Sequence, residues 1–192
     1  MNHLAHALVS GADEELILGS MLGDFVHGRI DTALPLGVQQ GLALHRAVDV
    51  FTDSHPMIVT TRALFQPPFR RYAGIILDIW FDHLLALDFA RWSGESLETY
   101  SVDLLDILLR HSDTLPPELR GFLRYMQMHD LPLAYRDEAR IVQVLAGVGT
   151  RLKRANPLAE SMVEIERLRP ELQITFEAFF PELVAFGERR RG

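Results

Sequence analysis

Residues 75–87, which read IILDIWFDHLLAL, decide the fold class. In helical projection, apolar side chains surround this stretch on nearly every side, so it is predicted to form a helix buried among other helices. Three polar residues, Asp78, Asp82 and His83, interrupt the apolar run. A lone carboxylate in such surroundings is costly, so each group must be neutralised, paired or bound to a cation.

Asp78 and Asp82 are four residues apart and therefore lie on one face of the predicted helix. Their mutual repulsion favours a bound cation. The sequence offers only His83 and distant arginines as protein cations, so a divalent metal is an economical interpretation.

The predicted helix over residues 35–54 carries the same combination. His45, Asp49 and Asp53 recur at every fourth position and form one polar stripe. A His and an Asp with this spacing can ligate one ion, or one can orient the other. Asp53 could instead cap the next helix. Arg46 lies about 100° around the helix from His45, where its guanidinium could bind a phosphate.

Two further predicted helices contribute polar groups. Asp24 lies near the C-terminal end of the helix expected over residues 13–27, where the helix dipole also favours a cation. The first helix offers His3 and His6, of which His3 is expected at the surface or as a helix cap.

These groups also have purely structural interpretations. His6, taken alone, could be a satisfied core histidine. Ion pairs between Arg46 and Asp49, or between Arg62 and Asp82, could neutralise the carboxylates without a metal. We favour the metal centre because three different helices each place acidic or imidazole groups on an apolar face.

Helical periodicity continues along the whole chain, and alternating strand patterns are scarce. No repeat, low-complexity tract or flexible linker divides the 192 residues. We therefore expect an all-α fold, a single compact bundle of about nine to ten helices over residues 1–192. The expected helices are 2–9, 13–27, 35–54, 56–65, 70–92, 96–111, 117–130, 135–150, 157–168 and 170–189.

Composition restricts the chemistry. The chain has no cysteine, which excludes disulfides, thiolate metal sites and cysteine nucleophiles, and a His/carboxylate site suits Mn, Mg, Fe or Zn. The net charge of −7 argues against a general nucleic-acid binder. No apolar run is long enough to span a membrane and no signal peptide is visible, so a cytoplasmic location is expected.

At these residues the sequence resembles the acyl carrier protein phosphodiesterase family. The motifs are Asn2-x-Leu4-Ala5-His6, Gly23-Asp24-Phe25-Val26-x-Gly28, His45-Arg46-x-x-Asp49-x-x-Thr52-Asp53 and Leu77-Asp78-x-x-x-Asp82-His83. The likeness is densest over residues 1–90 and covers essentially the whole chain. That family is similar to the HD-domain phosphohydrolases, so the resemblance implies an HD-domain-like fold with a His/Asp metal centre.

The resemblance also implies an activity. It is hydrolysis of the phosphodiester that joins 4′-phosphopantetheine to a serine of acyl carrier protein, usually with Mn²⁺, to give apo-carrier protein and 4′-phosphopantetheine. The implied metal ligands are Asp24, His45, Asp49, Asp78, Asp82 and His83. Together with Arg46 they form the implied catalytic set.

His6, His27 and Arg46 are the implied substrate contacts, and His6 is also implied as a metal ligand or as a residue that supports the ligands. His27 departs from the family, which usually has Lys or Arg at this position. Because the chain is acidic overall, docking of an acidic carrier protein would need a local basic patch. The candidates are Arg29, Arg62, Arg70 and Arg71.

Two other functions stay open at this point. The first is an HD-like phosphohydrolase that acts on a nucleotide or another small phosphate ester. The second is a non-catalytic helical binding protein in which the acidic stripe serves only the structure. The sequence does not indicate the oligomeric state.

Overall fold

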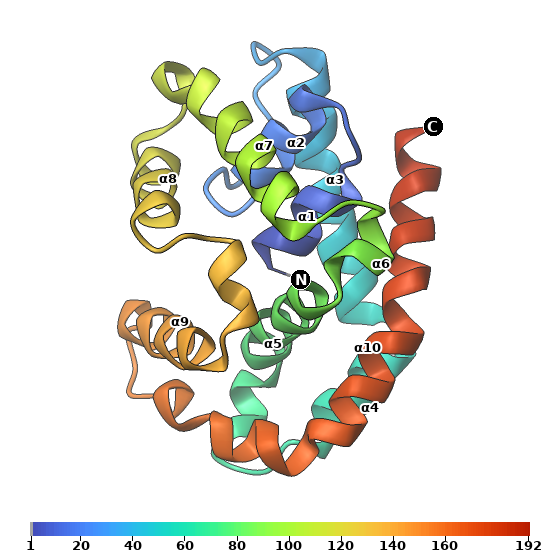
Figure 1. Ribbon diagram of the computed structural model, residues 1–192, viewed down its shortest axis with the longest axis vertical. Coiled ribbons are helices and arrows are strands. Elements are labelled where there is room, and N and C mark those ends of the chain that lie inside the picture. The colour runs from blue at the N-terminus through green and yellow to red at the C-terminus, as the bar shows by residue number, and fades with distance from the viewer. Residues whose placement is uncertain (1) are drawn as a thin grey trace.

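The stretch that decides the fold class forms α5 (Ala73–Leu87), which lies at the centre of the molecule (Figure 1). Trp80, Phe81 and Leu85 of this helix are almost completely buried. Burying side chains of this size stabilises the fold by about 1.5–3 kcal/mol each. Helices α1, α4, α9 and α10 pack against α5, so the central helix organises the core.

The computed structural model describes residues 2–192, and within them the chain is helical, with no strand. The expectation of an all-α fold is confirmed. The remaining elements are α1 (His3–Val9), α2 (Glu14–Leu22), α3 (Leu36–Ser54), α4 (Pro56–Leu64), η1 (Phe69–Tyr72), α6 (Phe89–Ser93), α7 (Leu97–Arg110), η2 (Ser112–Thr114), α8 (Pro117–Met128), η3 (Leu133–Arg136), α9 (Glu138–Arg151), η4 (Leu158–Glu160) and α10 (Met162–Arg191).

Local sequence explains where several helices begin. The side chain of Asp13 accepts the N–H of Leu16 at 3.0 Å and caps α2. Ser96 caps α7 through the N–H of Thr99, and Asp137 caps α9. A side-chain oxygen at this position satisfies one of the N–H groups that have no partner inside the helix.

The largest differences from the expected helices occur at three places in the chain. The segment over 13–27 stops being helical at Leu22, and the segment over 70–92 is divided into η1, α5 and α6. The break at Asp88 turns the chain so that Phe89 is buried and its ring packs 4.8 Å from that of Tyr100.

The third difference is at the C-terminus, where the two expected helices are one helix, α10. Pro170 lies inside it and removes one backbone hydrogen bond without ending the helix. Buried apolar residues continue at helical spacing on both sides of the proline, so packing against the core outweighs the local preference. These residues are Ile165, Leu168, Leu172, Phe176, Phe179 and Leu183.

Helices α2 and α3 pack unusually closely because glycines face each other. A Cβ atom on Gly19 would lie 2.1 Å from the carbonyl oxygen of Val38, and one on Gly41 would lie 2.3 Å from that of Leu16. Neither position can hold a side chain without separating the helices. This contact brings the end of α2 beside the middle of α3.

Substituting Gly41→Ala is therefore expected to lower the free energy of unfolding by about 1–3 kcal/mol, because the new methyl group meets backbone that cannot move alone. Gly121→Ala in α8 is the matched control, since the nearest atom to its added Cβ is 3.9 Å away. The control should be neutral or slightly stabilising. Urea unfolding measures both, and equal stabilities would contradict the close contact.

Every helix within residues 2–192 is too short or too polar to traverse a lipid bilayer.

Candidate metal centre

Two buried histidines form the floor of the site. The rings of His6, on α1, and His45, on α3, stack with their centroids 3.8 Å apart. Only 2% of the His6 side chain and 4% of the His45 side chain are exposed. Each Nε2 points to a different oxygen of Asp49: His6 lies 3.1 Å from Oδ1 and His45 lies 3.3 Å from Oδ2.

Two carboxylates form the rim. Asp24 follows the end of α2, with Oδ1 3.6 Å from Nε2 of His45 and Oδ2 3.3 Å from Nδ1 of His3. The side chains of Asp24 and Asp49 are 48% and 44% exposed, so both can meet a ligand from solvent. They border a cavity of about 370 Å³ that Arg46 also lines.

Gly23 lets α2 approach the floor of the site. A Cβ atom at this position would lie 2.1 Å from Cγ of His45, so only glycine leaves room for the imidazole. The Nδ1 atoms of His6 and His45 are buried without a hydrogen-bond partner. The His45 ring is therefore oriented by packing between Gly23 and the ring of His6.

The arrangement suits a metal ion. His6, His45 and Asp49 offer ligand atoms that all lie within 4.8 Å of one another. Ligand atoms at about 2.0–2.2 Å from one ion are about 3–4 Å apart, and the His–Asp separations fall in that range. Within residues 2–192 no other such group of three His, Cys, Asp or Glu side chains occurs. Two imidazoles and a carboxylate suit Mn, Fe or Zn.

The titratable groups leave the site with a net negative charge, which attracts a cation. Burial disfavours the protonated form of His45, but the adjacent carboxylates of Asp24 and Asp49 outweigh burial and raise its pKa to about 9. Burial lowers the pKa of His6 to about 4. Although burial opposes it, hydrogen bonding to His45 lowers the pKa of Asp24 to about 2 and holds that of Asp49 below its usual range. Two carboxylates therefore share one imidazolium, which an ion would have to deprotonate in order to bind.

This protonation predicts how the stability of metal-free protein depends on pH. The pKa of His45 is raised above 6.5, so its stabilisation is complete below about pH 6.5 and is lost as the pH rises through about 9. In EDTA, we expect the free energy of unfolding to fall by about 1–3 kcal/mol between pH 7.5 and 9.5. His45→Gln should remove this decrease and His111→Gln should not. The same decrease in both variants would contradict the assignment.

Arg46 holds the loop that forms one wall of the cavity. Its Nη1 donates to the carbonyl of Gly28 at 2.7 Å, and its Nη2 donates to that of Val26 at 3.0 Å. His27 lies in this loop, is exposed and lines the same cavity. Arg46 and His27 are thus beside the candidate metal centre, where the sequence predicted substrate contacts.

The structure does not bring Asp82 into the His6–His45–Asp49 group. Asp82 is completely buried, and its two oxygens accept the backbone N–H groups of Leu4 at 2.8 Å and of Ala5 at 3.1 Å. Burial raises the pKa of Asp82 to about 7, although the two N–H donors oppose this. Asp82 therefore holds the first turn of α1, from which His6 projects.

His83 points in another direction from Asp82. Its Nδ1 lies 2.7 Å from the carbonyl oxygen of Tyr135 in η3, and its Nε2 lies 4.0 Å from Glu138. Asp78 is half-buried one turn earlier on α5 and is also outside the group of three. Of the six implied ligands, the structure brings together Asp24, His45 and Asp49, and His6 lies with them.

Asp53, the last residue of the polar stripe, also lies outside the His6–His45–Asp49 group. Asp53 forms an ion pair with Nη2 of Arg62 at 2.6 Å. Of the four arginines considered for docking, Arg62 is therefore engaged within the protein.

His3 was expected at the surface or as a helix cap, and the structure places it at the site, only partly exposed. Its side chain is 18% exposed, it pairs with Asp24, and its ring lies 4.2 Å from that of Phe122. The spacing of His3 and His6 was the available signal, because residues three apart share a helix face.

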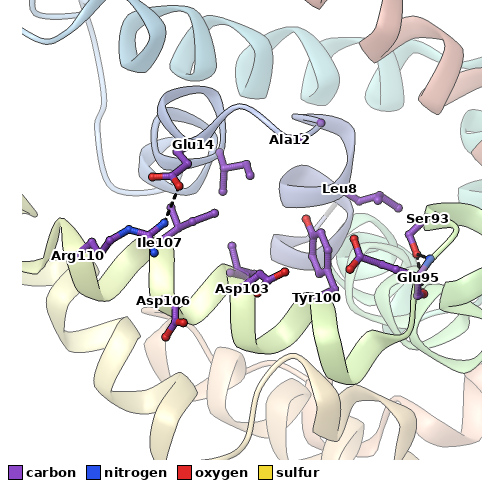
Figure 2. Close-up of a pocket in the computed structure, with 13 residues that line it drawn as sticks. Leu8, Ala12, Glu14, Ser93, Glu95, Tyr100, Asp103, Asp106, Ile107 and Arg110 are labelled. Atoms are coloured by element: carbon purple, nitrogen blue, oxygen red, sulfur yellow. Dashed lines mark hydrogen bonds and ion pairs between the residues drawn. The ribbon is translucent and has the colours of Figure 1, made fainter.

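A larger cavity, of about 500 Å³, lies between the α1–α2 segment and α7 (Figure 2). Glu95, Asp103 and Asp106 line it, and its Arg110 is paired with Glu14 at 2.6 Å. This lining repels anions. It shares no residue with the candidate metal centre, so we do not place the chemistry there.

Comparisons with known proteins cover nearly the whole chain. The family model described as "Acyl carrier protein phosphodiesterase" matches residues 1–183. A protein of that name from Serratia proteamaculans is 32% identical over 185 residues, 96% of each chain. Proteins of the same name from Photorhabdus laumondii and Escherichia coli are 30% and 29% identical and span 96% and 99% of their own lengths. No solved structure matches significantly.

Proposed function

This chain belongs to the acyl carrier protein phosphodiesterase family, and on that premise we propose that it hydrolyses the phosphodiester between 4′-phosphopantetheine and a serine of acyl carrier protein. The products are apo-carrier protein and 4′-phosphopantetheine. The observation that supports this most is the His6–His45–Asp49 group at the edge of an open cavity. Its members come from two of the motifs that carry the family resemblance.

His6, His45 and Asp49 would hold a divalent ion, with Asp24 at the rim as a fourth ligand. Mn²⁺ is our first choice, and Mg²⁺, Fe²⁺ or Zn²⁺ also suit the donor set. When bound, such an ion offsets the charge that develops on the phosphate oxygens and makes a nearby water more acidic.

His3 and Asp24 are suited to moving the proton of the attacking water. Burial lowers the pKa of His3, so its imidazole is neutral near pH 7 and can accept a proton. Asp24, 3.3 Å from Nδ1 of His3, would stabilise the imidazolium that results. Asp24 itself is a poor base, since its pKa is only about 2.

The other predicted site residues receive separate roles. Arg46 and His27 would contact the substrate at the mouth of the cavity, with Arg46 also fixing the loop. Asp82 and His83 would position α1 and η3, because the oxygens of Asp82 and Nδ1 of His83 contact backbone groups there. A ligand role for Asp78 stays a prediction, as do the likeness to HD-domain phosphohydrolases and a cytoplasmic location.

The test is incubation of the purified protein with holo-acyl carrier protein, in Mn²⁺ or in EDTA, followed by mass measurement of the carrier protein. We expect loss of one phosphopantetheine group in Mn²⁺ only. Turnover of a nucleotide without this loss would favour a different phosphohydrolase. Absence of metal binding and of turnover would favour a non-catalytic binding protein.

A further inference from the structure

We propose that a narrow slot between α8 and α9 receives the end of the pantetheine arm nearest to the phosphate, with Arg151 beside the phosphate. The slot is defined by His3, Phe122, Tyr125, Val144, Val148 and Arg151. This inference rests on the proposed function, because that function supplies the arm.

His3 connects the slot to the candidate metal centre. One side of its ring pairs with Asp24 through Nδ1, at 3.3 Å. Its ring packs 4.2 Å from that of Phe122, and the same side chain forms part of the slot. Only the side chain of His3 therefore separates a phosphodiester held at the rim from the mouth of the slot.

The walls of the slot are apolar and only half-buried. Phe122 and Tyr125 come from α8, and Val144 and Val148 come from successive turns of α9. When a ligand covers apolar side chains that are partly exposed between two helices, removal of their surface from water favours binding. The first carbons of the arm after the phosphate are a methylene and a quaternary carbon with two methyl groups, which match such walls.

The size of the slot selects among phosphate esters. Its volume is about 50 Å³, about a third of the roughly 150 Å³ of an apolar cavity that holds a benzene ring. It therefore admits part of an unbranched chain or a pair of methyl groups, and a nucleobase is too large. This favours the pantetheine arm over a nucleotide as the group that lies beside His3.

Arg151 supplies the charge that a phosphate requires. It lies in the last turn of α9, lines the slot and is exposed. Its side chain is exposed, so its guanidinium can form two parallel hydrogen bonds with a phosphate.

Val148→Phe tests the slot, because the larger ring fills it. In Mn²⁺, we expect calorimetry to show at least about tenfold weaker binding of 4′-phosphopantetheine, while inorganic phosphate and the metal bind within about twofold of the wild type. Val142→Phe is the matched control, since Val142 lies on α9, is exposed and does not line the slot. Unchanged binding of 4′-phosphopantetheine by Val148→Phe would overturn the inference.

A second variant keeps the test decisive if Val148→Phe does not fold. Arg151→Gln should weaken binding of both 4′-phosphopantetheine and inorganic phosphate by about tenfold, and Arg154→Gln, on the exposed segment beyond α9, should not. Equal effects of the two substitutions would overturn the role of Arg151.

Release of phosphopantetheine from the holo-carrier protein by the wild type is measured separately. If the wild type releases phosphopantetheine but Val148→Phe still binds it normally, this inference is refuted and the proposed function is not.

Discussion

Asp49→Asn is expected to remove the bound metal and to lower kcat/KM for phosphopantetheine release by about 10³-fold or more. The reason is the geometry of the carboxylate, which presents one oxygen to His6 and the other to His45. Asparagine keeps the shape but has no negative charge and only one oxygen. Because the Asp49 side chain is 44% exposed, the fold should be retained. Metal analysis, circular dichroism and the carrier-protein assay measure the three quantities.

Asp53→Asn is the matched control for this substitution. Asp53 lies one turn further along α3, and its side chain is 66% exposed and paired with Arg62. An exposed ion pair of this kind contributes little, so metal content and activity should remain within about twofold of the wild type. Full metal content in Asp49→Asn would refute the assignment of Asp49 as a ligand.

Asp82→Ala is expected to lower the free energy of unfolding by about 2–4 kcal/mol, even in EDTA. The substitution removes both acceptors for the N–H groups of Leu4 and Ala5, which would then be buried without partners at the start of α1. It also leaves a space at a position that is completely buried. Urea unfolding of metal-free protein measures this loss directly.

Two readouts separate this structural role from the ligand role that the family resemblance implied for Asp82. A ligand would lower stability mainly in the presence of metal, whereas a residue that holds α1 lowers it equally with and without metal. Asp106→Ala, on the exposed face of α7, should change stability by less than about 0.5 kcal/mol. A wild-type unfolding curve for Asp82→Ala in EDTA would contradict the role in α1.

The arrangement of the site explains why a metal would be needed. Without one, Asp24 and Asp49 share a single imidazolium on His45, and the site repels a phosphodiester. An ion that replaces the His45 proton removes this excess negative charge. In the proposed metal centre, the buried imidazoles and the half-exposed carboxylates would therefore accept an anion more readily once a cation has bound.

The sequence alone determined the helical class and most helix positions. Glycine and proline separate segments whose apolar residues repeat at helical spacing, so α3 and α4 begin and end within about a residue of the expected bounds. The pairing of His45 with Asp49 was also predictable, because residues four apart share one face of a single helix. Pro170 misled the prediction, since burial on both sides of it continues the helix.

Only the tertiary structure decided which polar groups meet. Periodicity assigns a side chain to a helix face but does not say which element packs on that face. Asp82 and His83 are adjacent in the chain, yet one holds α1 and the other lies against η3. His6 reaches Asp49 across 43 residues because the glycines of α2 and α3 allow close packing and Asp82 fixes the start of α1. The residue types determine which chemical groups are available, and long-range packing determines which of them come together in one site.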